Sequence, residues 1–191
     1  MNNSEQEIVK AVDALKNGQT ILYPTDTIWG IGCNATDSQA VERIYSIKQR
    51  DRNKSMLVLC ADLGMVRSVA GSIDEDIEEL MLSERPTTVI VPACNGVLAA
   101  NLPAADGTIG IRIPNNPFCQ QLLRLFGKPI VSTSANISKH PSPTCYADID
   151  AGLKKIVDFC LPSWMEDSGS THRSSRIVKK MPDGTLTVLR P

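Results

Sequence analysis

Helical and strand-like patterns alternate along most of this chain, and that alternation constrains its fold more than any other feature. Residues 4–18 show apolar side chains at helical spacing, and residues 20–23 then form a short apolar run that Pro24 ends. Asp37 or Ser38 is placed to cap a second helix, which carries Val41 and two isoleucines on one side. Alternating helices and strands are typical of α/β proteins.

The remaining segments continue this pattern to the C-terminus. We expect helices at 62–69, 74–83 and 117–126, and strands at 56–60, 88–91, 109–113, 129–131 and 156–161. Residues 4–7 (SEQE) fit a capping box at the start of the first helix. Residues 176–178 and 186–189, with a turn at 182–184, predict a hairpin, so the sheet should contain antiparallel as well as parallel pairs. With no repeat, low-complexity tract or linker, residues 1–191 are predicted to form a single domain.

The composition is typical of a soluble protein whose net charge is too small to create a strong overall electrostatic field. Of the 191 residues 42% are hydrophobic and 21% charged, and the formal net charge is −1. A balanced chain attracts neither nucleic acid nor membrane as a whole, so an anion site would need local clustering of cations. The N-terminus lacks the basic and apolar regions of a signal peptide, and no apolar run approaches the ~20 residues of a membrane span. We therefore expect a cytoplasmic protein that does not engage a membrane.

Cysteine and histidine are arranged unfavourably for a metal site. The six cysteines are scattered without a C-x-x-C pair, and the two histidines are His140 and His172. This spacing argues against a zinc site, a disulfide framework and a cysteine–histidine or serine–histidine triad. We expect no metal held by protein side chains alone.

A polar cluster directly follows the apolar run at 129–131. Residues 132–136 (STSAN) and 141–144 (PSPT) offer hydroxyl and amide groups without net charge, which suit phosphate or sugar oxygens. In open α/β sheets ligands bind at such strand ends. The alternative is an ordinary turn, which is the more frequent role of these residue types.

A basic cluster follows the helix predicted after Asp37. Lys48, Arg50, Arg52 and Lys54 alternate along the connection to the next strand. Such cations could surround a polyphosphate, with arginine giving forked contacts and lysine a point charge. A solvated basic face and stabilisation of the helix C-terminus are the alternatives.

Residues 30–35 (GIGCNA) fit G-x-G-x-x-A formally, yet we do not assign a dinucleotide site to them. That fingerprint needs a strand running into the first glycine and a helix beginning within the motif. Here residues 24–27 interrupt the approach, and the helix cap comes later. The chain also has no G-x-x-x-x-G-K-[ST] phosphate loop.

Taken together, these motifs resemble those of the YrdC-like family. The matching segments are 23–33 (YPTDTIWGIGC), the K-x-R of residues 48–50, the apolar-Arg-apolar-Pro strand 109–114 (IGIRIP), the S-x-N of residues 134–136 and the P-S-P-T of residues 141–144. They occur in the family's order and cover essentially the whole chain.

The resemblance implies a nucleotidyltransferase, an L-threonylcarbamoyladenylate synthase in its short single-domain form. Such enzymes condense L-threonine, bicarbonate or CO2, and ATP into threonylcarbamoyl-AMP and pyrophosphate. Downstream threonylcarbamoyl-transferase proteins then use the adenylate to modify adenosine in tRNA. The family's fold is a strongly twisted, mixed parallel and antiparallel sheet flanked by helices, with a concave, positive ligand-binding face. Mg2+ would accompany the ATP.

The resemblance also assigns roles to residues. Lys48 and Arg50 would be catalytic, holding the triphosphate, and the wider set for ATP would be Lys48, Arg50, Lys54, Thr88, Ser134, Asn136, Ser142 and Arg190. The set for threonine would be Thr25, Thr27, Arg112, Ser132 and Ser175. For Arg112 the alternative is a structural ion pair, but an isolated arginine in an apolar strand needs an anion partner, which favours the ligand role.

Some positions depart from the family pattern. Asp51, Ser55, residues 84–85 (ER) and Arg176 replace the usual residues, so the roles given to Thr88 and Ser175 rest on a weaker match.

Two other functions are compatible with these motifs. A YciO-like paralogue without robust synthase activity is one alternative, although such paralogues typically lose the K-x-R and S-x-N pair kept here. A module of the same fold that binds double-stranded RNA or tRNA is another.

Overall fold

A nine-stranded mixed sheet organises the molecule. The computed structural model describes residues 2–51, 56–181 and 183–191, and in this part the strand order is β7-β1-β2-β6-β3-β5-β4-β8-β9. The strands are β1 (Ile21–Tyr23), β2 (Gly30–Asn34), β3 (Leu57–Leu59), β4 (Thr87–Pro92), β5 (Thr108–Arg112), β6 (Ile130–Ser134), β7 (Phe159–Cys160), β8 (Arg176–Lys180) and β9 (Leu186–Arg190). The expected α/β fold with a mixed sheet is confirmed.

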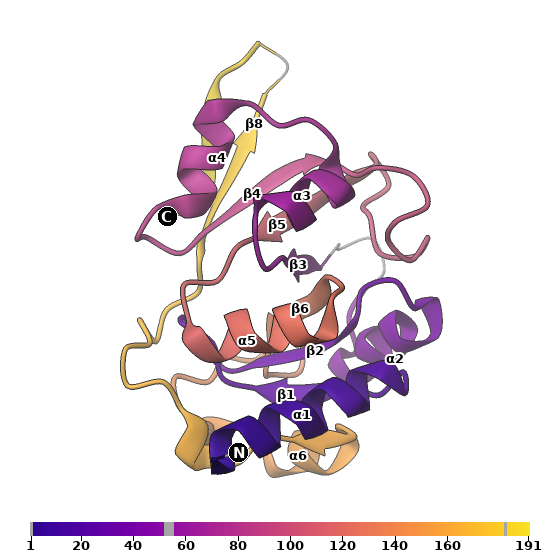
Figure 1. Cartoon of the computed structure of the whole chain (residues 1–191), viewed down its shortest axis with the longest axis vertical. Coiled ribbons are helices and arrows are strands. Elements are labelled where there is room, and N and C mark those ends of the chain that lie inside the picture. The colour runs from indigo at the N-terminus through magenta and orange to yellow at the C-terminus, as the bar shows by residue number, and fades with distance from the viewer. Residues whose placement is uncertain (1, 52–55, 182) are drawn as a thin grey trace.

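Parallel and antiparallel pairs alternate irregularly across this sheet. The strand β6 runs antiparallel to both β2 and β3, whereas β3–β5, β4–β8 and β1–β7 are parallel. The predicted C-terminal hairpin is present as the antiparallel pair β8–β9. Figure 1 shows the twist, because β1 and β2 lie across the view whereas β8 runs up it.

Helices cover the sheet and supply much of its core. They are α1 (Asn3–Lys16), α2 (Ser38–Lys48), α3 (Leu63–Ala70), α4 (Glu75–Leu82), α5 (Pro117–Phe126) and α6 (Ala151–Ile156). In Figure 1 α1, α2, α5 and α6 lie around β1 and β2, and α3 and α4 lie at the other end of the molecule. Ile8, Ala11 and Leu15 of α1 are buried, as the spacing predicted.

Side-chain caps fix where the helices begin. Asp37 accepts hydrogen bonds from the backbone at the start of α2, and Asn116 does so for α5, where Pro117 occupies the first turn. The first helix begins earlier than predicted. Its capping box is formed by Asn2 and Glu5, so the expected box at residues 4–7 is wrong by two positions.

The strand predicted at 156–161 is largely wrong. Asp150 caps the helix α6 by accepting a hydrogen bond from the Leu153 amide, and this helix continues through Ile156. Only Phe159–Cys160 then pairs with β1. The helix cap prevails over the local strand propensity of the apolar residues.

The strand β2, which lies between β1 and β6 in the sheet, was not predicted. All five of its residues, Gly30–Asn34, are buried. The next helix starts only after Asp37, which agrees with the rejection of a dinucleotide motif here. Within the described residues, none of the helices combines the length and hydrophobicity needed to cross a membrane.

Candidate functional site

A pocket of about 220 Å³ opens over the middle of the sheet. Its walls come from the segment between β1 and β2, from β4, β5 and β6, and from both flanks of the C-terminal hairpin. The lining residues are Thr25, Thr27–Gly30, Arg50, Met56, Leu57, Thr88, Ile90, Gly110, Arg112, Ser132–Ser134, Ser142, Ser174, Ser175, Ile177 and Arg190. Segments that lie far apart in sequence therefore share one cavity.

The structure brings most of the predicted site residues together in this pocket. Those that line it are Thr25, Thr27, Arg50, Thr88, Arg112, Ser132, Ser134, Ser142, Ser175 and Arg190. Lys48 and Asn136 are not part of the lining. Lys54 lies outside the described residues, as do Arg52 and Ser55.

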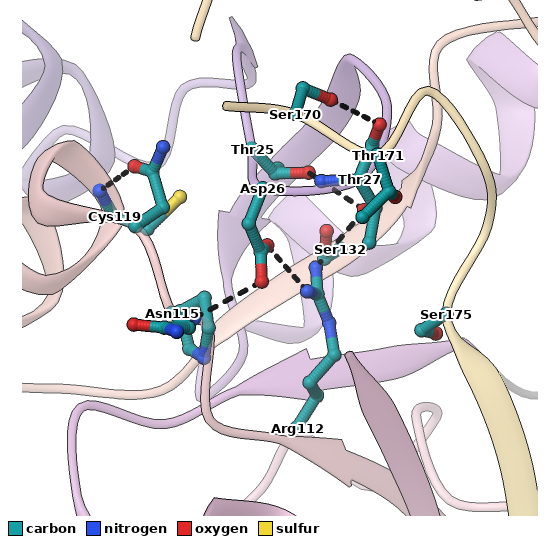
Figure 2. A network of polar contacts seen from close by, with 12 residues as sticks. Thr25, Asp26, Thr27, Arg112, Asn115, Cys119, Ser132, Ser170, Thr171 and Ser175 are labelled. Carbon is teal, nitrogen blue, oxygen red and sulfur yellow. Dashed lines mark hydrogen bonds and ion pairs between the residues drawn. The ribbon is translucent and has the colours of Figure 1, made fainter. Parts of the chain in front are cut away.

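The Arg112 guanidinium already has an anion partner within the chain. Its Nη1 donates to Asp26 Oδ1 at 2.5 Å, and both side chains are almost wholly buried. Asp26 Oδ2 also accepts from the Asn115 amide at 3.1 Å, so the carboxylate is held from two sides, as Figure 2 shows. The structural ion pair that was weighed as the alternative is therefore present, and the need for an anion partner no longer favours the ligand role. The Nε of Arg112 is nevertheless buried without a hydrogen-bond partner among the described residues, and the residue lines the pocket.

Hydrogen bonds set the direction in which the two threonine hydroxyls point. Thr25 Oγ1 donates its single proton to the Ile28 carbonyl at 2.8 Å and accepts from the Thr27 amide at 3.0 Å. The 2.8 Å contact between the two hydroxyls therefore has Thr27 as its donor. Thr27 Oγ1 consequently presents acceptor capacity to the pocket, with Arg112 Nη2 3.5 Å away.

The hydroxyls on the other walls are also paired. Tyr23 donates to Ser132 Oγ at 2.8 Å, and Thr88 Oγ1 lies 2.8 Å from Ser175 Oγ. Arg190 Nε donates to the Ser175 carbonyl at 2.9 Å, which fixes the guanidinium beside the pocket. The departures at residues 84–85 and Arg176 thus do not remove Thr88 and Ser175 from the lining.

Lys48, which is buried, and Asn136, which is half-buried, support Ser134 from behind. Lys48 is only 1% exposed, and its Nζ donates to the carbonyl oxygens of Ser134 and Asn136 and to Asn136 Oδ1. Asn136 Oδ1 accepts from Ser134 Oγ as well, and its amide nitrogen donates to the His140 carbonyl. The K-x-R and S-x-N motifs therefore meet in space, although Lys48 and Ser134 are 86 positions apart in the sequence.

Burial and neighbouring cations govern the charges here. Burial, followed by the nearby Arg50, lowers the pKa of Lys48 to about 7. Burial also lowers the pKa of Arg50, which is half-buried, and that of Arg190. Arg50, Arg112 and Arg190 line the pocket, and the described lining contains no carboxylate. Because Asp26 offsets the charge of Arg112, the positive charge of the pocket comes mainly from Arg50 and Arg190, in a chain whose net charge is −1.

Sequence reasoning missed Asp26 and Tyr23 as parts of the site. Both lie within the segment 23–33, so the motif itself was the available signal, but their partners are on β5 and β6.

No metal cluster of three or more histidine, cysteine or acidic side chains occurs among the described residues.

This architecture defines a class of α/β protein with a polar, positively charged pocket over the central strands of a mixed sheet. The chain belongs to the Sua5/YciO/YrdC family. Its sequence matches that family's model, described as "Telomere recombination", over residues 13–191.

Named relatives and solved structures agree with this membership. The chain is 31% identical to a threonylcarbamoyl-AMP synthase of Chromohalobacter salexigens, across 91% of this chain and 100% of the relative. It is 32% identical to the enzyme of that name from Bacillus subtilis, across 83% of this chain but 47% of the relative, so it spans about half the length of that protein.

The fold resembles P. abyssi Sua5 complexed with L-threonine, with a TM-score of 0.86 and 25% identity over 100% of this chain and 55% of that one. E. coli YciO gives a TM-score of 0.80 and 26% identity over 100% of this chain and 90% of that one.

Proposed function

We propose that the chain is an L-threonylcarbamoyladenylate synthase, which makes threonylcarbamoyl-AMP and pyrophosphate from L-threonine, bicarbonate or CO2, and ATP. The observation that carries the proposal is one pocket that combines three arginines with oriented hydroxyls and no carboxylate among its described lining residues. The names of the relatives and the L-threonine complex of P. abyssi Sua5 support it.

Threonine would occupy the part of the pocket nearest Arg112. The unpartnered Nε of Arg112 suits the substrate carboxylate, since a buried donor without an acceptor is costly until a ligand supplies one. Thr27 Oγ1, which faces the pocket as an acceptor, suits the hydroxyl or an N–H of the same ligand. Thr25, Ser132 and Ser175 would complete this end.

ATP would lie toward Arg50, Ser134, Ser142 and Arg190. Arg50 and Arg190 supply positive charge for the phosphates, and Ser134 supplies a hydroxyl at the end of β6. We assign Lys48 and Asn136 to the same function indirectly, because they hold Ser134 from behind. Lys54 and Thr88 stay in the proposed ATP set.

The reaction needs positioning and charge neutralisation rather than a covalent intermediate on the protein. The neutral amine of threonine reacts with CO2 to form a carbamate and releases one proton to solvent, and a carbamate oxygen then attacks the α-phosphorus of ATP. The bond from that phosphorus to the bridging oxygen breaks, and pyrophosphate leaves with its electron pair. Arg50 would neutralise charge that develops on the phosphates, which is where a fixed cation contributes most.

Mg2+ fits this proposal as an ion carried by the nucleotide. The described pocket lining offers hydroxyls and cations but no carboxylate, so the phosphates would supply the ligands that Mg2+ prefers. We further propose that the adenylate passes, in the cytoplasm, to threonylcarbamoyl-transferase proteins that modify tRNA.

The proposal is tested by incubating the protein with ATP, Mg2+, L-threonine and labelled bicarbonate and separating the nucleotides by chromatography. We expect a labelled adenylate and an equal amount of pyrophosphate, and neither product when threonine or bicarbonate is omitted. Absence of the adenylate under all conditions would contradict the proposal.

The likeness to E. coli YciO favours one rival, a paralogue of the same fold without synthase activity. Nucleotide binding without adenylate formation is the result expected of that rival. A salt-sensitive shift of double-stranded RNA or tRNA without ATP turnover would instead favour an RNA-binding module.

A further inference from the structure

We propose that Tyr23 is a positioning residue, whose buried phenol fixes the Ser132 hydroxyl so that its proton points into the pocket. Ser132 then acts as a committed hydrogen-bond donor toward an anionic ligand group. This inference rests on the proposed function for the identity of that group, the threonine carboxylate, but its geometry stands on the fold alone.

The ring of Tyr23 reaches across an intervening strand. Tyr23 lies on β1, Ser132 lies on β6, and β2 runs between them with Gly30 opposite Tyr23 and Gly32 opposite Ser132. A Cβ atom on Gly32 would come within 2.9 Å of the Tyr23 ring, and one on Gly30 would come within 3.5 Å. The two glycines therefore leave the space that the ring occupies, which gives the G-x-G of this strand a packing role.

The hydrogen bond at the end of this ring has a defined direction. Tyr23 is fully buried and donates to Ser132 Oγ at 2.8 Å. Burial, together with the neighbouring Cys119, raises the pKa of Tyr23 well above its usual value, so the phenol keeps its proton at any physiological pH. Ser132 must therefore use one oxygen lone pair as the acceptor.

The hydroxyl proton of Ser132 is therefore available to donate to a ligand in the pocket. Among the described residues no other hydrogen-bond partner of Ser132 Oγ is present, and the side chain lines the cavity. Figure 2 places Ser132 in one group with Arg112 and Thr27. Ser132 and Arg112 donate, and Thr27 accepts, so the pocket distinguishes the carboxylate of a ligand from its hydroxyl or N–H group.

A double-mutant cycle separates this role from simple core packing. Tyr23→Phe keeps the ring over the two glycines and removes only the hydroxyl, and Ser132→Ala removes the group on which it acts. We expect Tyr23→Phe to raise the KM for threonine about fivefold to tenfold, as for one lost hydrogen bond, while the KM for ATP stays unchanged. In the Ser132→Ala background the same change should have no further effect.

Thr20→Val is the matched control, because Thr20 is buried next to β1 and donates its hydroxyl to Asp158, away from the pocket. It should lower stability without changing the KM for threonine. Effects of Tyr23→Phe and Ser132→Ala that multiply, or an unchanged KM in Tyr23→Phe, would overturn the proposal.

A second measurement does not depend on synthase activity. Crystal structures of the wild type and of Tyr23→Phe should show one Ser132 rotamer in the wild type and a moved or mixed rotamer in the variant. A single unchanged rotamer would overturn the positioning role. A wild type that makes no adenylate but shows the rotamer change would contradict the proposed function and leave the positioning role supported.

Discussion

At the scale of single residues, Lys48 combines a buried charge with three acceptor oxygens. Replacing it by methionine, Lys48→Met, removes a donor from the Ser134 and Asn136 carbonyls and from the Asn136 side-chain oxygen, and should cost about 1–3 kcal/mol of unfolding free energy. The cost should depend on pH. The pKa of Lys48 falls from 10.5 to about 7 on folding, so between these values the unfolded chain binds more protons and wild-type stability rises with pH.

Urea unfolding of the wild type and of Lys48→Met at pH 7 and pH 9 measures this dependence. We expect the difference in free energy of unfolding to be larger at pH 9. A difference that stays constant with pH would show that the pKa of Lys48 is not lowered.

Arg50 is expected to contribute to the reaction rather than to the fold. It lines the pocket and is half-buried, so Arg50→Ala should lower kcat/KM by an amount equivalent to about 2 kcal/mol or more while unfolding changes little. Arg43→Ala is the control, because Arg43 is an exposed arginine of the preceding helix that pairs with Asp158. Steady-state kinetics of both variants test this expectation. Near-normal turnover in Arg50→Ala would contradict the catalytic role assigned to Arg50.

Variants of Asn136 and Ser134 should distinguish a residue that supports the pocket from one that contacts ATP. Ser134→Ala removes a pocket hydroxyl and should weaken ATP binding with little loss of stability. Asn136→Ala removes an acceptor shared by Lys48 and Ser134, so it should weaken ATP binding and also lower stability, by about 1–3 kcal/mol. Calorimetric titration with ATP and urea unfolding measure the two effects. Unchanged ATP affinity in both variants would contradict the placement of the phosphates.

At the scale of elements, β2 tolerates side chains very unequally. A Cβ atom on Gly32 would lie 2.4 Å from the Val131 carbonyl, whereas on Gly30 the nearest contact would be 3.3 Å. We expect Gly32→Ala to cost about 3 kcal/mol, the upper end of typical overpacking, and Gly30→Ala clearly less. Urea unfolding of the two variants tests this, and equal costs would show that the strand does not pack as described.

Elements with local signals could be predicted from the sequence, and elements set by distant contacts could not. The helix at 117–126 matched its predicted bounds because a capping Asn, a first-turn Pro and Gly127 are all local. The strand β2 was missed because its glycines reflect the Tyr23 ring and the neighbouring strand, not any strand propensity of their own. The same limit applies to α6, where one cap at Asp150 decided the outcome.

The site residues, too, could be predicted where the signal was local and not where it depended on distant contacts. The motifs placed Arg50, Ser134 and Arg112 near a ligand, and the fold brings all three to one pocket. Neither the Arg112–Asp26 pair nor the burial of Lys48 could be predicted, because each depends on partners about 86 residues away. Spacing along a chain carries no information on such contacts unless the topology is known.

At the scale of the whole molecule, the pocket is a local positive region in a nearly neutral protein. Arg50, Arg112 and Arg190 come from three separate parts of the chain, and the fold gathers them around one cavity. Such an arrangement attracts a small polyanion into the pocket without making the whole surface attractive to nucleic acid.

Choice of amino acid tests the central claim most directly. The measurement is pyrophosphate release from ATP and bicarbonate with L-threonine, L-serine or L-valine. We predict that threonine is preferred over valine, by as much as ~10⁴-fold in kcat/KM, because valine has no hydroxyl to donate to the acceptor Thr27 Oγ1. Serine, which keeps the hydroxyl and loses a methyl contact, should be a weaker substrate. Comparable release with valine and threonine would contradict the hydroxyl-reading pocket and the function proposed from it.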